Sequence, residues 1–237
     1  GNGTDFLSYA SSSSAVSVNL ATNAVSGGYA AGDAVSGFEN VEGSAWSDTL
    51  DGDSSDNVIV GLAGNDVVHD GLGNDLIDLG DGDDFIVLAG GADTVYGGNG
   101  TDTIYYTSST AGVSVDLQTN VLSGGWAADD VISGFENVEG SAYVDTLKGT
   151  DTANSLKGWA GNDVLDGRGG DDTLNGGTGS DTITTGSGSD VIRFTDVSFG
   201  NDQVTDYQDG VDHLSFALSI ADSITDFTIT GNGTSSV

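Results

Sequence analysis

Residues 61–69 read GLAGNDVVH and residues 97–105 read GGNGTDTIY. Both stretches follow one nine-residue pattern, in which Gly residues come first, the sixth residue is Asp and the eighth is aliphatic. The pattern continues without insertion over residues 43–105 and again over residues 140–193. The eighth residue is aliphatic in all thirteen rows, and the sixth is Asp in eleven of them. Two such regular columns predict a repeat architecture in which each row is one structural unit.

A second, longer period of 97 residues encloses the first. GTDFLSYASSSSAVSVNLATNAVSGG from Gly3 corresponds to GTDTIYYTSSTAGVSVDLQTNVLSGG from Gly100. The two periods predict two tandem units followed by a C-terminal segment. The expected boundaries are 1–99 for the first unit (solenoid segment 3–42, nonapeptide rows 43–105 running into the next unit), 100–193 for the second (solenoid segment 106–139, nonapeptide rows 140–193) and 194–237 for a capping segment.

One row contains a short strand and a turn. Positions seven to nine are rich in aliphatic and β-branched residues, which predicts a strand of three residues with one inward side chain. The Gly-rich half predicts a turn, because Gly adopts positive φ without steric penalty. A three-residue strand buries little by itself, so we expect the rows to stack into two facing parallel sheets with turns along both edges.

The Asp residues of these turns are expected to form columns. Two rows complete one coil of eighteen residues, so alternate rows share an edge, and carboxylates in a column are about 4.8 Å apart. Ca²⁺ resolves the repulsion between them, because it accepts six to eight carboxylate and carbonyl oxygens. The predicted metal ligands are Asp66, Asp84 and Asp102 on one edge, Asp75 and Asp93 on the other, and likewise Asp163 with Asp181 and Asp172 with Asp190, all by side chain, and Gly64, Gly73, Gly82, Gly91, Gly100, Gly161, Gly170, Gly179 and Gly188 by backbone carbonyl.

The rows GGNGTDTIY and GGTGSDTIT resemble the GGxGxDxUx nonapeptide of the repeats-in-toxin (RTX) proteins, which binds calcium in that family. The resemblance covers about half of the chain directly. It implies an all-β fold, namely a right-handed parallel β-roll or β-solenoid that binds several Ca²⁺ ions. It also implies disorder without calcium, folding after export, and passage through a type I secretion system of a Gram-negative bacterium.

Some residues depart from this pattern. Trp46, Ser55, Tyr143 and Thr152 replace the Gly of position four, and Asn57 and Asn154 replace the Asp of position six. We therefore expect the opening rows of each block to carry structure without metal. In the capping segment, Asp202, Asp206, Asp209 and Asp212 are expected either to hold a terminal ion or to solvate the end of the roll.

The composition excludes several classes of partner. The chain of 237 residues has 37 acidic and 4 basic residues and a formal net charge of -33, which argues against nucleic acids and anionic membranes. No apolar run is long enough to span a membrane. The chain begins at Gly1 rather than Met and has no signal-peptide pattern, which suggests an excised fragment. The expected location is secreted or extracellular, at or near a cell surface.

The segments between the rows have two interpretations. They contain alternating stretches such as VSVNL and VSVDL, which indicate strands. In one interpretation Tyr29, Trp46, Trp126 and Tyr143 form a surface that binds a glycan or a neighbouring protein. In the favoured one, the segments are wider coils of the same solenoid and these aromatic residues cap its core.

No catalytic site is expected in this chain. A metalloprotease of the HExxH type needs paired His residues, and the chain has only His69 and His213, far apart in the sequence. Lys148, Lys157, Arg168 and Arg193 are scattered, and the two lysines are expected on opposite sheets. Two roles remain for the parent protein: a surface-layer or adhesin-type structural protein that self-assembles or binds a glycan, or a secreted enzyme with this chain as its accessory module.

Overall fold

The computed structural model describes residues 3–195, 199–217 and 228–229. It is all-β, as predicted; the described residues contain two short 3-10 helices, η1 (Gly28–Ala30) and η2 (Gly125–Ala127). None of the helices in the described part has the length and apolar character needed to cross a membrane. The chain divides into two compact units: residues up to Tyr105 with Trp126–Phe135, and Tyr106–Gly125 with the residues from Glu136 onward. The boundaries predicted from the 97-residue period rest on sequence similarity and stay a prediction.

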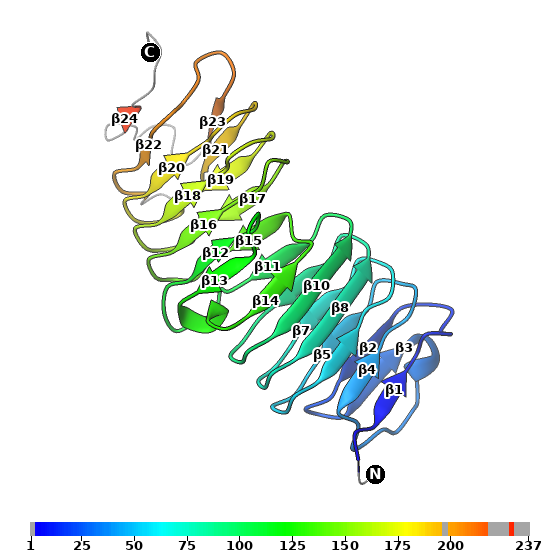
Figure 1. The fold of residues 1–237 in the computed structure, drawn as a ribbon. Helices are drawn as coiled ribbons and strands as arrows, with labels where there is room; N and C mark the ends of the chain where they lie inside the picture. Colours follow the sequence, from blue (N-terminus) through cyan, green and yellow to red (C-terminus); the bar gives the residue numbers. More distant parts are fainter. Residues whose placement is uncertain (1–2, 196–198, 218–227, 230–237) are drawn as a thin grey trace. The chain divides into compact units, whose positions relative to one another are not determined.

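In the first unit, successive rows contribute strands alternately to two sheets (Figure 1). Every pairing is parallel except the β2–β3 hairpin. One sheet has the order β1 (Phe6–Ser8), β4 (Asn40–Glu42), β6 (Val58–Val60), β8 (Leu76–Asp81), β10 (Thr94–Asn99), β14 (Val131–Ser133). The other has the order β3 (Ala24–Gly27), β2 (Val16–Asn19), β5 (Thr49–Asp51), β7 (Val67–His69), β9 (Phe85–Val87), β11 (Thr103–Tyr105).

The second unit repeats this arrangement, with β12–β13 as its antiparallel hairpin. One sheet has the order β15 (Asn137–Glu139), β17 (Ser155–Lys157), β19 (Thr173–Asn175), β21 (Val191–Phe194), β23 (His213–Phe216). The other has the order β13 (Val121–Ser123), β12 (Ser114–Asp116), β16 (Thr146–Lys148), β18 (Val164–Asp166), β20 (Thr182–Thr184), β22 (Gln203–Val204), β24 (Thr228–Ile229). The predicted fold class, a parallel β-solenoid of the β-roll type, is therefore confirmed. The predicted placement of Lys148 and Lys157 on opposite sheets is also correct.

The aliphatic column of position eight forms the core of each unit. Leu50 pairs with Val68, and Val68 pairs with Ile86, each eighteen residues further along the chain. All thirteen side chains of this column have an exposed fraction of 0%, whereas flanking residues such as Val67 and Phe85 face outward. Each row thus adds one fully buried side chain, and the hydrophobic effect favours stacking because a single row cannot bury it alone.

The glycines of position four allow the turns to stack closely. Gly100 has a φ of +140°, and a Cβ built on it would lie 1.8 Å from the carbonyl oxygen of Gly82 in the coil before. Gly91 lacks the positive φ, yet its Cβ would lie 1.7 Å from the carbonyl oxygen of Gly73. Close approach of one backbone to the next, rather than φ alone, therefore requires Gly in these turns.

The segments before the rows are wider coils of the same solenoid. Their strands β2 and β12 pair in parallel with β5 and β16 of the rows. The prediction that their aromatic residues cap the core is wrong for Tyr29, Trp46 and Tyr143, whose exposed fractions are 58%, 53% and 50%. Trp126 is partly buried. Tyr106, fully buried, contributes to the core instead, because it directly follows a strand and continues the inward face.

Two adjacent glycines provide a matched test of the close stacking. Gly91→Ala should destabilise the chain by about 1–3 kcal/mol, because the added methyl group overlaps the backbone of Gly73. Gly90→Ala should change the stability by less than about 1 kcal/mol, since the nearest atom to its Cβ is 3.7 Å away. Urea denaturation in millimolar calcium measures both. Equal midpoints for the two variants would contradict this account of the turns.

Candidate metal sites

The Asp side chains of position six form hydrogen-bonded columns along both edges of the first unit. On one edge, the backbone N–H of Asp48 donates to Oδ1 of Asp66, that of Asp66 to Asp84, and that of Asp84 to Asp102, at 2.7, 2.7 and 2.9 Å. Each carboxylate therefore binds the coil before it. The other edge continues in the same way, through Asn57 to Asp75 (2.7 Å), Asp75 to Asp93 (2.8 Å) and Asp93 to Asp130 (3.1 Å).

The second unit has the same two columns, and residues of the C-terminal segment complete them. The donor and acceptor pairs are Asp145 to Asp163, Asp163 to Asp181 and Asp181 to Asp202 on one edge, and Asn154 to Asp172, Asp172 to Asp190 and Asp190 to Asp212 on the other, at 2.8–3.2 Å. The structure thus brings the predicted Asp residues together in the predicted columns.

The second oxygen of eight of the full-row carboxylates has no hydrogen-bond partner. Their side chains are almost completely buried, with exposed fractions of 3% or less. A buried carboxylate oxygen without a donor is costly, since burial removes the water that would solvate it. The Oδ2 atoms in this state belong to Asp66, Asp75, Asp84, Asp93, Asp163, Asp172, Asp181 and Asp190.

Burial raises the pKa of these carboxyl groups. The pKa of Asp66 is raised to about 8, first by burial and then by the charges of Asp84 and Asp48, although the Asp48 N–H lowers it. Burial also raises the pKa of Asp84 to about 6 and that of Asp163 to about 7. The hydrogen bonds from the protein therefore do not stabilise the ionised carboxylates enough to offset the cost of their burial.

The opening rows differ from the full rows in the hydrogen bonds of their position-six side chains. Ser44 donates both its N–H and its hydroxyl hydrogen to the carboxylate of Asp48. Ser141 does the same for Asp145. In Asn57 the amide oxygen accepts from Asp53 and the amide nitrogen donates to Glu39. These side chains have their hydrogen-bond partners inside the protein, and the expectation that the opening rows carry no metal stays a prediction.

A second set of hydrogen bonds, not predicted from the sequence, runs along the outside of the turns. The position-five side chains of Asn65, Asp83 and Asn74 accept the N–H groups of Asp83, Thr101 and Ala92 in the coil that follows. Positions five and six therefore bind neighbouring coils in opposite directions. The recurrence of Asn and Asp at position five is the sequence signal that indicates this role.

Apart from the C-terminal segment, four further acidic residues in or beside the columns lie outside the predicted set. Asp130 enters from β14, outside the nine-residue count. Asp70 occupies position one, where most rows have Gly, and burial raises its pKa to about 8. The remaining two, Asp48 and Asp145, belong to the opening rows.

The acidic residues of the C-terminal segment have different surroundings. Asp202 and Asp212 are buried and end the two columns. Asp206 accepts hydrogen bonds from Thr185 and from the N–H of Gly186, and Asp209 is exposed. Asp202 and Asp212 thus continue the columns, whereas Asp206 and Asp209 do not, and the terminal ion stays a prediction.

The basic residues have structural contacts. Arg168 forms a bidentate ion pair with Asp116 at 2.6 and 2.9 Å and also donates to the carbonyl of Gly149. Lys157 lies 3.1 Å from the ring centroid of Trp159 and 3.8 Å from the carboxylate of Glu139. Both contacts match the structural role expected for these side chains.

A parallel β-solenoid whose turns carry buried Asp columns defines a repeat protein built for cation binding. The family model described as the RTX calcium-binding nonapeptide repeat (4 copies) matches residues 33–68, 51–86, 80–108, 139–174 and 166–195, more than half of the chain. The chain therefore belongs to the family of RTX calcium-binding nonapeptide repeat proteins, as the sequence predicted. Membership of this family implies Ca²⁺ binding. A comparison with curated proteins found no match.

The raised pKa values predict that the calcium-free chain is more stable in mild acid than at neutral pH. A carboxyl group whose pKa lies above its ordinary value of 3.8 when folded keeps its proton better in the folded state. Its contribution to stability is therefore complete below pH 3.8 and is lost as the pH rises through about 6 to 8. Circular dichroism in EGTA should therefore show more β structure at pH 5 than at pH 8.

Asp66→Asn should weaken this pH dependence, because the amide does not titrate. Asp78→Asn, at an exposed position on β8, serves as the control and should leave it unchanged. A β content in EGTA that is constant or rises between pH 5 and pH 8 would contradict the assignment of buried, uncompensated carboxylates.

Proposed function

We propose that this chain is a calcium-dependent β-roll whose ions lie between successive coils at both edges. The buried Oδ2 atoms without hydrogen-bond partners are the observation that carries the proposal. The ligands would be the position-six side chains from Asp66 to Asp102 and from Asp163 to Asp190, with carbonyl oxygens from the position-four glycines.

The chemistry of these groups favours Ca²⁺ over other common ions. All donors in the turns are carboxylate or carbonyl oxygens, which suit a hard cation with six to eight ligands. Zn²⁺ prefers Cys and His, and the sequence has no Cys and only two His. Mg²⁺ requires a stricter octahedral geometry than a flexible Gly-rich turn offers.

A requirement for calcium would couple folding to export. With a net charge of -33, the chain should repel itself when no cation is bound. A ligand that binds only the folded state stabilises that state by mass action. RTX repeat proteins are typically secreted by bacteria. We infer that this chain crosses the Gram-negative envelope unfolded by type I secretion and folds on meeting extracellular calcium.

For the parent protein we favour a surface-layer or adhesin-type role. Trp46 and Tyr143 are equivalent residues of the two repeat units and both are exposed, as is Tyr29. Exposed aromatic side chains fit contact with a glycan or a neighbouring copy better than a role in the core. The competing role is an accessory module of a secreted protease, lipase or polysaccharide-modifying enzyme whose catalytic domain lies in another part of that protein.

A calcium titration followed by circular dichroism tests the binding proposal. At pH 8 the β signal should be lost in EGTA and return with calcium. Asp84→Asn should raise the calcium concentration at half-folding several-fold, because it removes one ligand charge while an amide oxygen can still accept the N–H of Asp66. Asp53→Ala, in an opening row, should have a smaller effect.

Equal β content in EGTA and in millimolar calcium would count against the whole proposal. Sedimentation velocity during the same titration separates the two roles of the parent protein. Calcium-dependent assemblies favour the surface protein, and a folded monomer favours the accessory module.

A further inference from the structure

Asp70 is an ionisable residue at a position that usually holds Gly. It is the first residue of the row 70–78, and the equivalent residue in the second unit, 97 positions later, is Gly167. The two units otherwise match here, since Asp75 and Asp93 correspond to Asp172 and Asp190. The chain therefore offers two versions of one edge site, one with a third carboxyl group and one without.

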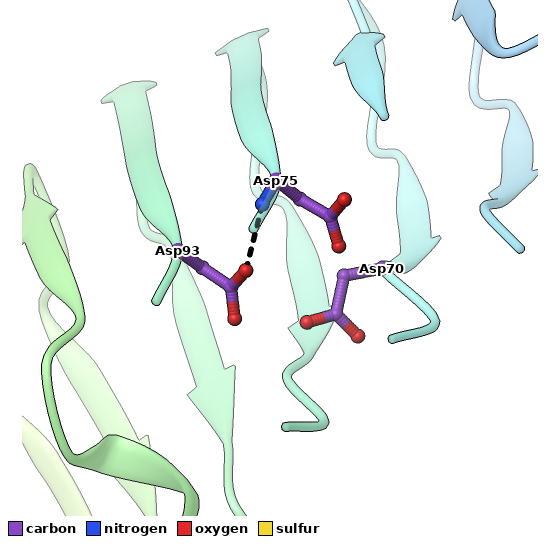
Figure 2. A group of neighbouring side chains, drawn as sticks. All are labelled: Asp70, Asp75 and Asp93. Atoms are coloured by element: carbon purple, nitrogen blue, oxygen red, sulfur yellow. Dashed lines mark hydrogen bonds between the residues drawn. The ribbon is translucent and has the colours of Figure 1, made fainter. Parts of the chain in front are cut away.

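The third carboxyl group points into the space between coils. Asp70, Asp75 and Asp93 have exposed fractions of 2%, 3% and 1%, and their potential ligand atoms all lie within 4.8 Å of one another (Figure 2). Among the residues that the structure describes, no other group of three His, Cys, Asp or Glu side chains comes this close. Oδ2 of Asp75 has no hydrogen-bond partner and is buried in this group.

Hydrogen bonds fix Asp70 in this position. Its carboxylate accepts the N–H of Gly71 at 2.7 Å and that of Ala89, in the next coil on this edge, at 3.0 Å. These two N–H groups do not offset the charges of three neighbouring buried carboxylates when all three are ionised. A bound cation would neutralise the charges of these three carboxylates.

The backbone is displaced to admit this side chain. The N–H of Asp70 lies 3.4 Å from the carbonyl of Val87, whereas the same ladder bond from Gly167 to Thr184 is 2.9 Å. A Cβ at Gly167 would lie 2.3 Å from Oδ2 of Asp172, so the regular geometry has no room for it. The first unit thus has a weaker ladder bond at the one position where it gains a carboxylate.

We propose that Asp70, Asp75 and Asp93 together form a three-carboxylate Ca²⁺ site that fills at lower calcium concentration than the two-carboxylate sites of the full rows. The inference rests on the proposed function, because it assumes that calcium binds between coils. Affinity for Ca²⁺ rises with the charge of the ligand set and the rigidity of the site. A coil pair that binds calcium first also gives neighbouring rows a surface on which to stack, so the site initiates folding of the first unit.

Competition with a chromophoric calcium chelator, applied to the full chain, measures the separate binding steps. The unaltered chain should show one step about tenfold tighter than the others. Asp70→Asn keeps the size of the side chain, and Asp70→Gly restores the residue found at 167; both should abolish this tight step and leave the weaker steps in place. Asp78→Asn removes a charge from the exposed end of the same row and should leave the tight step unchanged.

The outcomes distinguish this inference from the proposed function. If both Asp70 variants keep the tight step, or if Asp70→Asn binds calcium more tightly, the three-carboxylate site is wrong while calcium-dependent folding stands. If the unaltered chain has only equivalent steps, the site is likewise wrong. If no calcium binds to any variant, the proposed function itself fails.

Discussion

The hydrogen bond from a backbone N–H to the Asp side chain of the next coil on the same edge is the contact on which the rest of the structure depends. It recurs every eighteen residues in each column, as from Asp66 to Asp84. It fixes the register of the turns, and the register in turn places the position-eight side chains directly above one another in the core. In the full rows, Oδ1 of such a carboxylate accepts the backbone N–H, and Oδ2 lies buried.

That second oxygen links the fold to the dependence on a cation that we propose. A hydrocarbon column and a ladder of hydrogen bonds would stabilise a neutral solenoid, but this one buries a carboxylate in nearly every coil. The opening rows show an alternative, since Ser44 and Ser141 supply internal donors to Asp48 and Asp145. The full rows have no Ser at this position, and the Oδ2 atoms of Asp66 and Asp163 have no internal donor. A ligand that binds such rows only when they are folded would stabilise them.

Most of the fold could be predicted, because the nine-residue period of the sequence determines how the strands of successive coils align. A nine-residue period with one aliphatic residue per row leaves little freedom for the strands, and the Asp columns follow from the alternation of edges. Asp130 could not be predicted, because it joins its column 37 residues after Asp93, beyond a wider coil with no fixed count. The prediction that the aromatic residues cap the core was wrong for Tyr29 and Trp46, which are exposed. The hydrophobicity of a side chain does not determine whether it faces the core or the solvent in these coils. Asp70 departs from the repeat, and its place beside Asp75 and Asp93 is evident only in the structure.

Anomalous X-ray diffraction from crystals grown in calcium tests the central claim most directly. The account predicts anomalous peaks between coils along both edges, each within 2.3–2.6 Å of oxygens from position-six Asp residues such as Asp84 and Asp181. The opening rows beside Asp48 and Asp145 should carry none. Ordered turns without peaks at the full rows, in crystals that contain millimolar calcium, would contradict it.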